Sequence, residues 1–456
     1  MRTTAGARPP WGLLARGAGA AAVLILLSVT VGARQSGVGE APAVAWPLLW
    51  ERELAVADKA YQTVVVADLD GDGAGEPVVV ARQRGAPSQV TVLDGRDGGV
   101  RWARAWSGRV ECAAADIEAG GGSELVVAWL DSLQVLSGAD GSVLRSLALK
   151  APVGEIVFGL VDGDERPDLI YTAGHDYDDL LVAVSGASWR DLWVRRTEPD
   201  RGILGGGFEK VTPLDLDGDG RDEVLAVERR NTLVCLEPTG ATLWTTVLGK
   251  KTRYLPEGVA SSRPVAADLA ARGANDVAVG CFAGALVVLD AAGGEQVARM
   301  QFGLDTHARY ARDPRLPRFL RGIVAGSGEP ITEILVTEID GRPGADLVFG
   351  SCDGFVYAVA PRRAEILWRF DSISDVYGRC IALPADEPLL VAWDAKATYV
   401  LRAADGALAG RLPLEGGVRC AAEGDVNGDG ILDVVAVAAG GSVARAWSTG
   451  IAAGRP

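Results

Sequence analysis

The sequence predicts an all-β fold, an eight-bladed β-propeller made of four-stranded antiparallel blades. Three observations predict it. An acidic, glycine-rich loop followed by a valine-rich run recurs along the chain, two short apolar strands follow most copies, and the two ends of the chain supply complementary parts of one blade. From Asp68 to Asp425 the loop starts advance 357 residues in seven steps, an average of 51. That spacing lies near the periods expected of propeller blades.

The best-defined loop spans residues 68 to 76 and reads Asp-Leu-Asp-Gly-Asp-Gly-Ala-Gly-Glu. Its first, third, fifth and ninth residues carry side-chain oxygens, and the backbone carbonyl of the seventh adds another. Glycines let the backbone curl so that these oxygens turn inward, and a hard cation prefers an oxygen cage. The pattern predicts a calcium site formed by Asp68, Asp70, Asp72, Ala74 and Glu76.

An EF-hand is the main alternative for such a loop, but it would close with a glutamate at position twelve and continue into a helix. Position twelve is Val79, within the run Pro77-Val78-Val79-Val80. This run is too short and too rich in valine for a flanking helix. We therefore expect the loop to lead into a buried strand.

Two further copies keep the full donor pattern, so we expect about three structural Ca²⁺ sites. The worn copies start at Asp116, Leu160, Asp268, Glu338 and near Asp386. Three of these depart from the pattern and are not expected to bind calcium strongly, because of Leu160 in the third loop, Ala270 and Arg272 in the fifth, and Arg342 in the sixth. The opposing interpretation is that the loops are acidic turns. The ligands of the two complete copies are Asp215, Asp217, Asp219, Arg221 and Glu223, and Asp425, Asn427, Asp429, Ile431 and Asp433, with Arg221 and Ile431 contributing carbonyls.

The second half of each repeat predicts two more strands, the last of which often carries Leu-Trp. The final repeat ends near Trp447 without this strand, whereas an orphan Leu48-Leu49-Trp50 precedes the first loop. We expect the N-terminal strand to complete the last blade, because closure pairs edge strands that would otherwise stay exposed. A count of seven follows instead if the shortened repeat near Asp386 merges with a neighbour. The periodic tryptophans are expected to pack between blades rather than to bind carbohydrate: Trp50, Trp102, Trp193, Trp244 and Trp368.

The first residues of the sequence predict an export signal. Arg2, Arg8 and Arg16 precede an apolar run over residues 17 to 33. Residues 1–34 are either a cleaved signal peptide or an uncleaved membrane anchor, residues 35–45 a linker, and residues 46–450 the propeller. Both interpretations place the propeller outside the cytoplasm, as a secreted or membrane-anchored protein of the cell envelope.

These motifs resemble the FG-GAP (VCBS-type) repeats of integrin α-subunit propellers. The segment from Leu93 to Trp102 also resembles the tryptophan-docking motif of quinoprotein (PQQ-like) dehydrogenases. The resemblance covers residues 46 to 447 and implies a propeller with calcium loops on the face opposite the ligand-binding face. It specifies the fold and the metal rather than the partner.

Composition narrows the choice of partners. The chain has 45 basic and 60 acidic residues and a net charge of -15, and it lacks a basic stripe, so nucleic acid is not expected. The longest insertion, residues 303 to 330, places five arginines beside Tyr310 and Phe319 in this acidic chain. It suits an acidic protein, an anionic glycan or lipid headgroups, or it is a solvated excursion.

We expect a non-enzymatic module that binds a protein or glycan, with no catalytic residues. The alternatives are a quinoprotein dehydrogenase or polysaccharide lyase, and a scaffold for envelope assembly. A quinone seat would call for an adjacent cysteine pair, but all six cysteines are isolated, and neither His175 nor His307 lies in a catalytic motif. Cys281 with Cys352, and Cys380 with Cys420, are candidate disulfides, the alternative being buried thiols.

Overall fold

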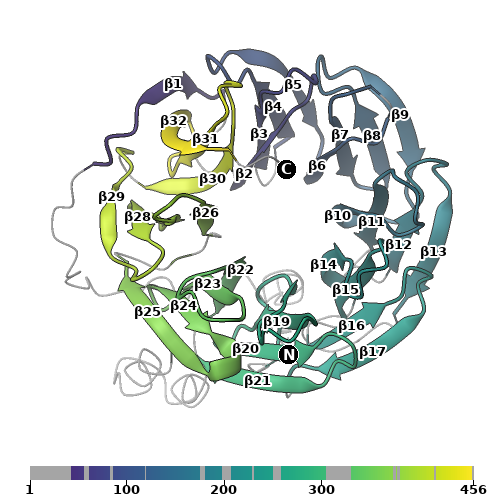
Figure 1. Ribbon diagram of the computed structural model, residues 1–456. Coiled ribbons are helices and arrows are strands. Elements are labelled where there is room, and N and C mark those ends of the chain that lie inside the picture. The colour runs from purple at the N-terminus through teal and green to yellow at the C-terminus, as the bar shows by residue number, and fades with distance from the viewer. Residues whose placement is uncertain are drawn as a thin grey trace, which may run out of the picture.

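The chain folds into an eight-bladed β-propeller (Figure 1), here seen in a computed structural model. Each blade is a four-stranded antiparallel sheet, and in blades 1 to 7 the strands follow the chain order from the centre outward. The alternative count of seven blades is wrong, because the short repeat near Asp386 forms its own sheet. The structure describes residues 43–55, 61–82, 86–118, 120–174, 180–197, 207–228, 231–249, 258–303, 330–372, 376, 380–414 and 417–453.

The first four blades take up the chain as far as residue 247. Blade 1 contains β2 (Tyr61–Ala67), β3 (Glu76–Arg82), β4 (Ser88–Leu93) and β5 (Val100–Trp106), and blade 2 contains β6 (Val110–Ala115), β7 (Glu124–Trp129), β8 (Ser132–Leu136) and β9 (Val143–Ala148). Blade 3 contains β10 (Val153–Gly159), β11 (Asp168–Ala173), β12 (Leu180–Val184) and β13 (Asp191–Arg196), and blade 4 contains β14 (Phe208–Leu214), β15 (Glu223–Glu228), β16 (Thr232–Leu236) and β17 (Thr242–Val247).

The remaining blades repeat this plan, and blade 6 also contains the short 3-10 helix η1 (Pro361–Arg363). Blade 5 contains β18 (Val265–Ala267), β19 (Asp276–Gly280), β20 (Ala285–Asp290) and β21 (Gln296–Gln301), and blade 6 contains β22 (Ile331–Thr337), β23 (Asp346–Ser351), β24 (Phe355–Ala360) and β25 (Glu365–Asp371). Blade 7 contains β26 (Ile381–Leu383), β27 (Leu389–Trp393), β28 (Thr398–Arg402) and β29 (Leu408–Arg411), and blade 8 contains β30 (Val418–Gly424), β31 (Ile431–Ala438), β32 (Val443–Ala452) and β1 (Leu48–Glu53).

The N-terminal strand closes the ring, as the sequence predicts. β1 is the outermost strand of blade 8 and pairs antiparallel with β32, with Trp50 opposite Ala446 and Glu53 opposite Val443. The amide of Leu54 extends the pairing to the carbonyl of Ser442 at 2.7 Å. The last blade therefore joins residues nearly 400 positions apart, and the outer edge of β32 is covered.

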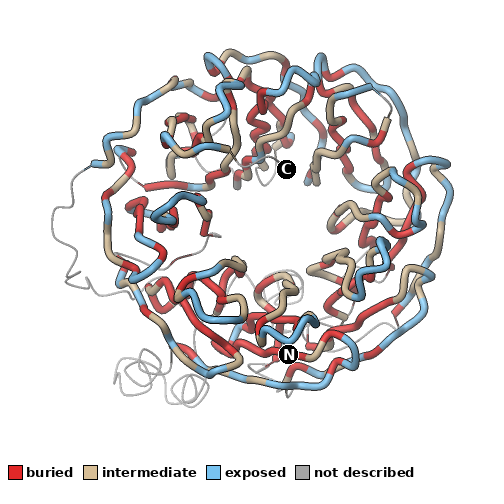
Figure 2. The backbone as a smooth tube through the Cα atoms, in the orientation of Figure 1, coloured by how far each residue is buried: buried red, intermediate tan, exposed pale blue. Residues whose placement is uncertain are grey.

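The core lies between the blades. The second and third strands of most blades are buried along nearly their whole length, as in β11 and β12 of blade 3, whereas the outermost strands, such as β13, are mainly exposed or half-buried (Figure 2). The described residues form eight hydrophobic clusters, and each spans two neighbouring blades. β-branched side chains fit such two-sided burial, which is why the valine-rich runs become middle strands.

The periodic tryptophans fasten one blade to the next, as predicted. The indole Nε1 of Trp102 in blade 1 donates to the carbonyl of Gly138 in blade 2 at 2.8 Å, and Gly141 of the same turn lies against the ring. Blade 2 has Arg145 at the matching position, and its guanidinium stacks over Trp189 of blade 3. The same indole hydrogen bond joins Trp50 to Gly95, Trp193 to Pro238, Trp244 to Ala291 and Trp368 to Ala403.

The alternation of antiparallel strands separates two faces of the ring. The acidic loops connect the first and second strands of each blade and therefore share one face with the turns that follow the third strands. The connections between blades leave from the opposite face, where β21 ends and β22 begins. The insertion at 304–329 lies outside the described residues, as do residues 1–42. Within the described part of the chain, no helix has the length and apolar character needed to span a membrane.

Candidate metal centres

Each acidic loop is a short turn held by its own side chains. We call the loops 1 to 8 after their blades. In loop 1 (68–76) the carboxylate of Asp68 accepts hydrogen bonds from the amides of Gly71 (2.7 Å) and Gly73 (3.0 Å). Both glycines have positive φ, +77° and +86°, which disfavours any side chain. This explains the spacing of glycines that the sequence shows.

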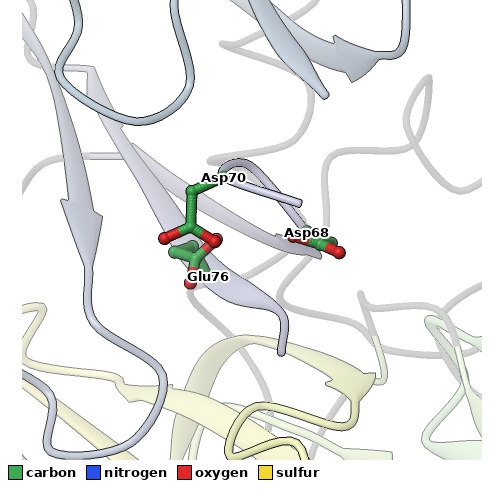
Figure 3. A group of neighbouring side chains, drawn as sticks. All are labelled: Asp68, Asp70 and Glu76. Atoms are coloured by element: carbon green, nitrogen blue, oxygen red, sulfur yellow. The ribbon is translucent and has the colours of Figure 1, made fainter. Parts of the chain in front are cut away.

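Loop 1 brings together three of its predicted ligands. Asp68, Asp70 and Glu76 each offer an oxygen, and these oxygens all lie within 4.8 Å of one another. Figure 3 shows the carboxylates of Asp70 and Glu76 close together, with Asp68 at the start of the loop. Asp72 stays outside this group, because it forms an ion pair with Arg96 at 2.7 Å on the exposed side.

Glu76 is the buried ninth-position carboxylate of loop 1. It is 1% exposed, and its Oε2 accepts a hydrogen bond from the Leu69 amide at 2.9 Å. Its Oε1 is buried without a hydrogen bond. Burial raises the pKa of Glu76 to about 7, a shift that the Leu69 hydrogen bond and the charge of Arg101 only partly offset. A buried carboxylate oxygen that accepts no hydrogen bond is suited to bind a cation.

Loop 4 (215–223) repeats this geometry. Asp215, Asp217 and Glu223 form a second group of oxygens within 4.8 Å of one another. The carboxylate of Asp215 accepts hydrogen bonds from the amides of Gly218 (2.6 Å) and Gly220 (2.9 Å), and Glu223 accepts one from the Leu216 amide at 3.0 Å. Burial again raises the pKa of Glu223. Asp219 is turned outward to Arg221 at 2.9 Å.

Loop 8 (425–433) keeps the same loop geometry but has an amide among its donors. Asp425 accepts hydrogen bonds from the amides of Gly428 and Gly430, at 2.8 and 2.7 Å. Asp433 is fully buried, and its Oδ1 accepts no hydrogen bond within the usual geometric limits. Burial raises the pKa of Asp433 to about 6, and the hydrogen bond from the Val426 amide only partly offsets this shift. Because Asn427 replaces a carboxylate, loop 8 offers a ligand set with less charge.

Loop 3 (160–168) is a candidate that sequence reasoning undervalued. Asp162, Asp164 and Asp168 form a third group of oxygens within 4.8 Å, although Leu160 replaces the first acid. A carboxylate of blade 4 lies beside the position of the missing acid, since Asp222 Oδ2 accepts a hydrogen bond from the Leu160 amide at 2.7 Å. The signal was present as the acids at the third, fifth and ninth positions. Asp168 differs from Glu76, however, because both of its oxygens accept backbone hydrogen bonds.

In loops 5 and 6, arginines lie where a cation would be expected. In loop 5 (268–276), Arg272 contacts the buried Asp276 at 2.5 Å and Asp290 at 2.9 Å. In loop 6 (338–346), Arg363 contacts both Asp340 and Asp346. Both loops are among the three that the sequence predicts to be poor calcium sites, and the guanidinium groups neutralise their buried acids.

The loops also connect neighbouring blades. The Ser123 amide of blade 2 donates to the carbonyl of Asp68 at 2.8 Å, and the Gly75 amide of blade 1 donates to the carbonyl of Asp425 at 2.7 Å. Asp222 and Leu160 are joined in the same way at 2.8 Å. A ligand that orders one loop therefore also orders the interface with the next blade.

The structure also bears on the predicted disulfides. No disulfide joins any of the six cysteines, all of which lie in the described part of the chain, so the bridges Cys281–Cys352 and Cys380–Cys420 are wrong. The matching repeat positions place each pair in adjacent blades without joining them, and burial raises the thiol pKa of Cys281 and Cys380 to about 12. His175 and His307 lie outside the described residues.

No family model and no curated protein matches the sequence. Solved structures do share its fold. Sqt1 from Saccharomyces cerevisiae is 13% identical with a TM-score of 0.59, over 88% of this chain and 98% of that one. BamB from Moraxella catarrhalis is 15% identical with a TM-score of 0.54, over 88% and 99%. The rhamnogalacturonan lyase YesW is 17% identical with a TM-score of 0.54, over 91% and 76%. At these identities the likeness shows the propeller fold alone.

Proposed function

We propose that the chain is an exported β-propeller of the FG-GAP type, with quinoprotein-like blade contacts, that binds structural calcium and presents a surface to a protein or glycan. The observation that carries the calcium proposal is the buried ninth-position carboxylate. Asp433 Oδ1 is buried without a hydrogen bond in loop 8. Glu76 Oε1 is likewise buried without a hydrogen bond in loop 1, where its nearby positive charge is Arg101 Nη2 at 3.2 Å. Burying such a group is costly unless a charge compensates it.

The donor set favours calcium among common cations. Every candidate ligand is a carboxylate, an amide or a backbone carbonyl, and neither histidine nor cysteine takes part. Such oxygen-only sets suit Ca²⁺, which accepts six to eight ligands in flexible geometry, whereas Mg²⁺ requires a near-ideal octahedron. Loops 1, 4 and 8 are the proposed sites, and loop 3 is a weaker fourth.

The proposed role of calcium is to stiffen the ring. Because the loops hydrogen-bond to neighbouring blades, as from Gly75 to Asp425, a cation bound in one loop would stabilise two blades together. An ion that binds only the folded state raises its stability by mass action.

Thermal unfolding tests the calcium proposal. Metal-free protein should melt at a lower temperature than protein in millimolar CaCl₂, and MgCl₂ should restore less of the difference. Asp217→Ala should reduce the calcium-induced increase, whereas Asp371→Ala, in the outer strand β25 and outside the acidic loops, should leave the increase unchanged. Equal melting temperatures with and without calcium, together with no calcium in elemental analysis, would contradict the proposal.

The interaction role rests on the sequence of the insertion at 303–330, most of which lies outside the described residues. The strands that it joins, β21 and β22, open toward the face opposite the acidic loops. Its five arginines suit anionic groups. Binding of the purified protein to an array of acidic glycans should be lost when Arg309, Arg312, Arg315, Arg318 and Arg321 are all replaced by serine. Cleavage of rhamnogalacturonan or another polysaccharide by the purified protein would contradict the non-enzymatic role.

A further inference from the structure

The first acidic loop differs from the other complete loops because an arginine contacts its buried ninth-position carboxylate. Arg101 lies on β5, directly before the docking residue Trp102. Its Nη1 contacts Asp70 Oδ2 at 2.5 Å, and its Nη2 contacts Glu76 Oε1 at 3.2 Å. Asp70 and Glu76 hold the third and ninth positions of loop 1, so the guanidinium neutralises two of the proposed calcium ligands.

The guanidinium and a calcium ion cannot use these oxygens at the same time. Calcium would take them at about 2.3–2.6 Å, which is the space that Nη1 and Nη2 now fill. A unit positive charge held beside the ion would also repel it. Glu76 Oε1 is buried and has no hydrogen bond, so Arg101 is its only close positive charge among the described residues. Occupation of the site by one cation therefore requires the other to leave.

Asp94 provides Arg101 with an alternative ion-pair partner. It lies in the turn after β4, outside loop 1, and its Oδ2 contacts Arg101 Nη2 at 3.2 Å and Arg101 Nε at 3.3 Å. If Arg101 releases Asp70 and Glu76, Asp94 can keep its partner in a solvent-facing ion pair. The displacement then costs two contacts rather than all of them.

The matching residues of the other complete loops lack this charge. The residue before the docking tryptophan is Leu243 in blade 4 and Leu49 in blade 8. Loops 5 and 6 have internal guanidinium groups, from Arg272 and Arg363, but they also lack donor residues at the calcium positions. Among the described loops, loop 1 alone combines a full set of donors with an arginine that contacts its buried ninth-position carboxylate.

We propose that Arg101 is an internal competitor for calcium, which makes loop 1 the weakest of the three proposed complete sites and keeps it neutralised when calcium is absent. This proposal rests on the proposed calcium binding of loops 1, 4 and 8. The position of loop 1 in the ring suggests what this competition does. Loop 1 lies at the closing interface, where the Gly75 amide bonds to Asp425 of blade 8 and Trp50 docks on Gly95. The closing interface then stays intact at low calcium and is reinforced at high calcium.

Calcium titration of the full chain by isothermal calorimetry tests the proposal. Loop 1 is isolated by removing the other sites with Asp164→Ala, Asp217→Ala and Asn427→Ala together. In this background Arg101→Leu, matched to Leu49 and Leu243, should strengthen calcium binding about tenfold or more. The reciprocal change Leu243→Arg, made with loop 4 intact, should weaken calcium binding at loop 4, because it places a guanidinium at the position that Arg101 has in blade 1. Glu237 occupies the position of Asp94 in this blade.

Melting temperatures separate this role from a purely structural one. In metal-free buffer Arg101→Leu should lower the melting temperature, since Asp70 and Glu76 lose their counter-charge, and added calcium should then raise it by more than it raises the parent protein. If Arg101 had only a structural role, Arg101→Leu would lower the melting temperature equally with and without calcium.

The outcomes are distinguishable. Unchanged or weaker calcium binding at loop 1 in Arg101→Leu, with loops 4 and 8 still binding, overturns the competition alone. If Arg101→Leu does not fold, unchanged affinity of loop 4 in Leu243→Arg has the same meaning. Absence of calcium binding from every loop of the parent protein overturns the proposed function as well.

Discussion

At the scale of single residues, the chain uses buried carboxylates as anchors for its loops. Glu76, Glu223 and Asp433 accept backbone hydrogen bonds from the start of their own loops. These hydrogen bonds hold each loop closed without a bound ion. The same burial raises the pKa of each group, because the charged form is removed from water. A raised pKa means that these carboxyls hold a proton more tightly than free carboxyls do, at the positions where we propose that calcium binds.

Glu76 gives the metal-free protein a specific pH dependence. A raised pKa in the folded state means that this carboxyl stabilises the fold fully below its unfolded value of 4.5, and that the contribution is lost as the pH rises through about 7. In metal-free buffer the free energy of unfolding should fall between pH 5 and 8, by on the order of 3 kcal/mol from Glu76. Urea denaturation at several pH values measures it.

Glu76→Gln supplies the control for this pH dependence. The variant should flatten the profile, leaving the smaller slope expected from Asp433, whose pKa is raised to about 6. Calcium should remove much of the slope in the parent protein, because the ion competes with the proton. Identical slopes for the parent and Glu76→Gln would contradict the account.

At the scale of the blade, the outer strand of one blade contacts a turn of the next. The tryptophan of one blade donates its indole N–H to a turn of the next, and a glycine of that turn lies flat against the ring. In blade 5 this glycine is Gly294, with φ of +70°, and a Cβ there would lie 2.5 Å from Cδ2 of Trp244. A side chain at this position is opposed by both backbone conformation and packing.

Gly294→Ala should therefore destabilise the protein by about 2 kcal/mol. Its neighbour provides a matched control, since a Cβ at Gly293 would meet nothing within 4 Å. Gly293→Ala should change the stability by less than about 0.5 kcal/mol. Chemical denaturation of both variants measures the difference, and equal stabilities would show that the docking contact does not carry the interface.

At the scale of the whole molecule, the ring depends on β1. This strand covers the outer edge of β32 and brings Trp50 to the turn of blade 1. Eight clusters of buried residues then continue from blade to blade without a break among the described residues. A ring of this kind leaves no blade interface exposed, which is the advantage of closure over an open stack.

Removal of residues 1–53 should open the ring. The edge of β32 and the docking surface of Trp50 would be exposed, and we expect a lower melting temperature and aggregation in light scattering. A truncation that stops at residue 42 retains β1 and serves as the control. Equal melting of the two truncated proteins would show that β1 is dispensable.

Sequence reasoning captured the features that repeat. Eight loop starts, the Leu-Trp strands and the orphan Leu48-Leu49-Trp50 were enough for the fold, the blade count and the closing strand, because each follows from a local pattern. It missed features that depend on contacts between repeats. Asp222 completes loop 3 from the next blade, and Arg101 enters loop 1 from 25 residues beyond it. The predicted disulfides failed because matching positions in adjacent blades need not bring sulfurs together.

Calcium stoichiometry tests the central claim most directly. Titration of the metal-free protein by isothermal calorimetry should show about three bound ions. Asp70→Ala, Asp217→Ala and Asn427→Ala should each remove the ion of their own loop and leave the others in place. Heats no larger than those of dilution, with the parent protein folded throughout, would mean that the acidic loops are only turns and would contradict the account.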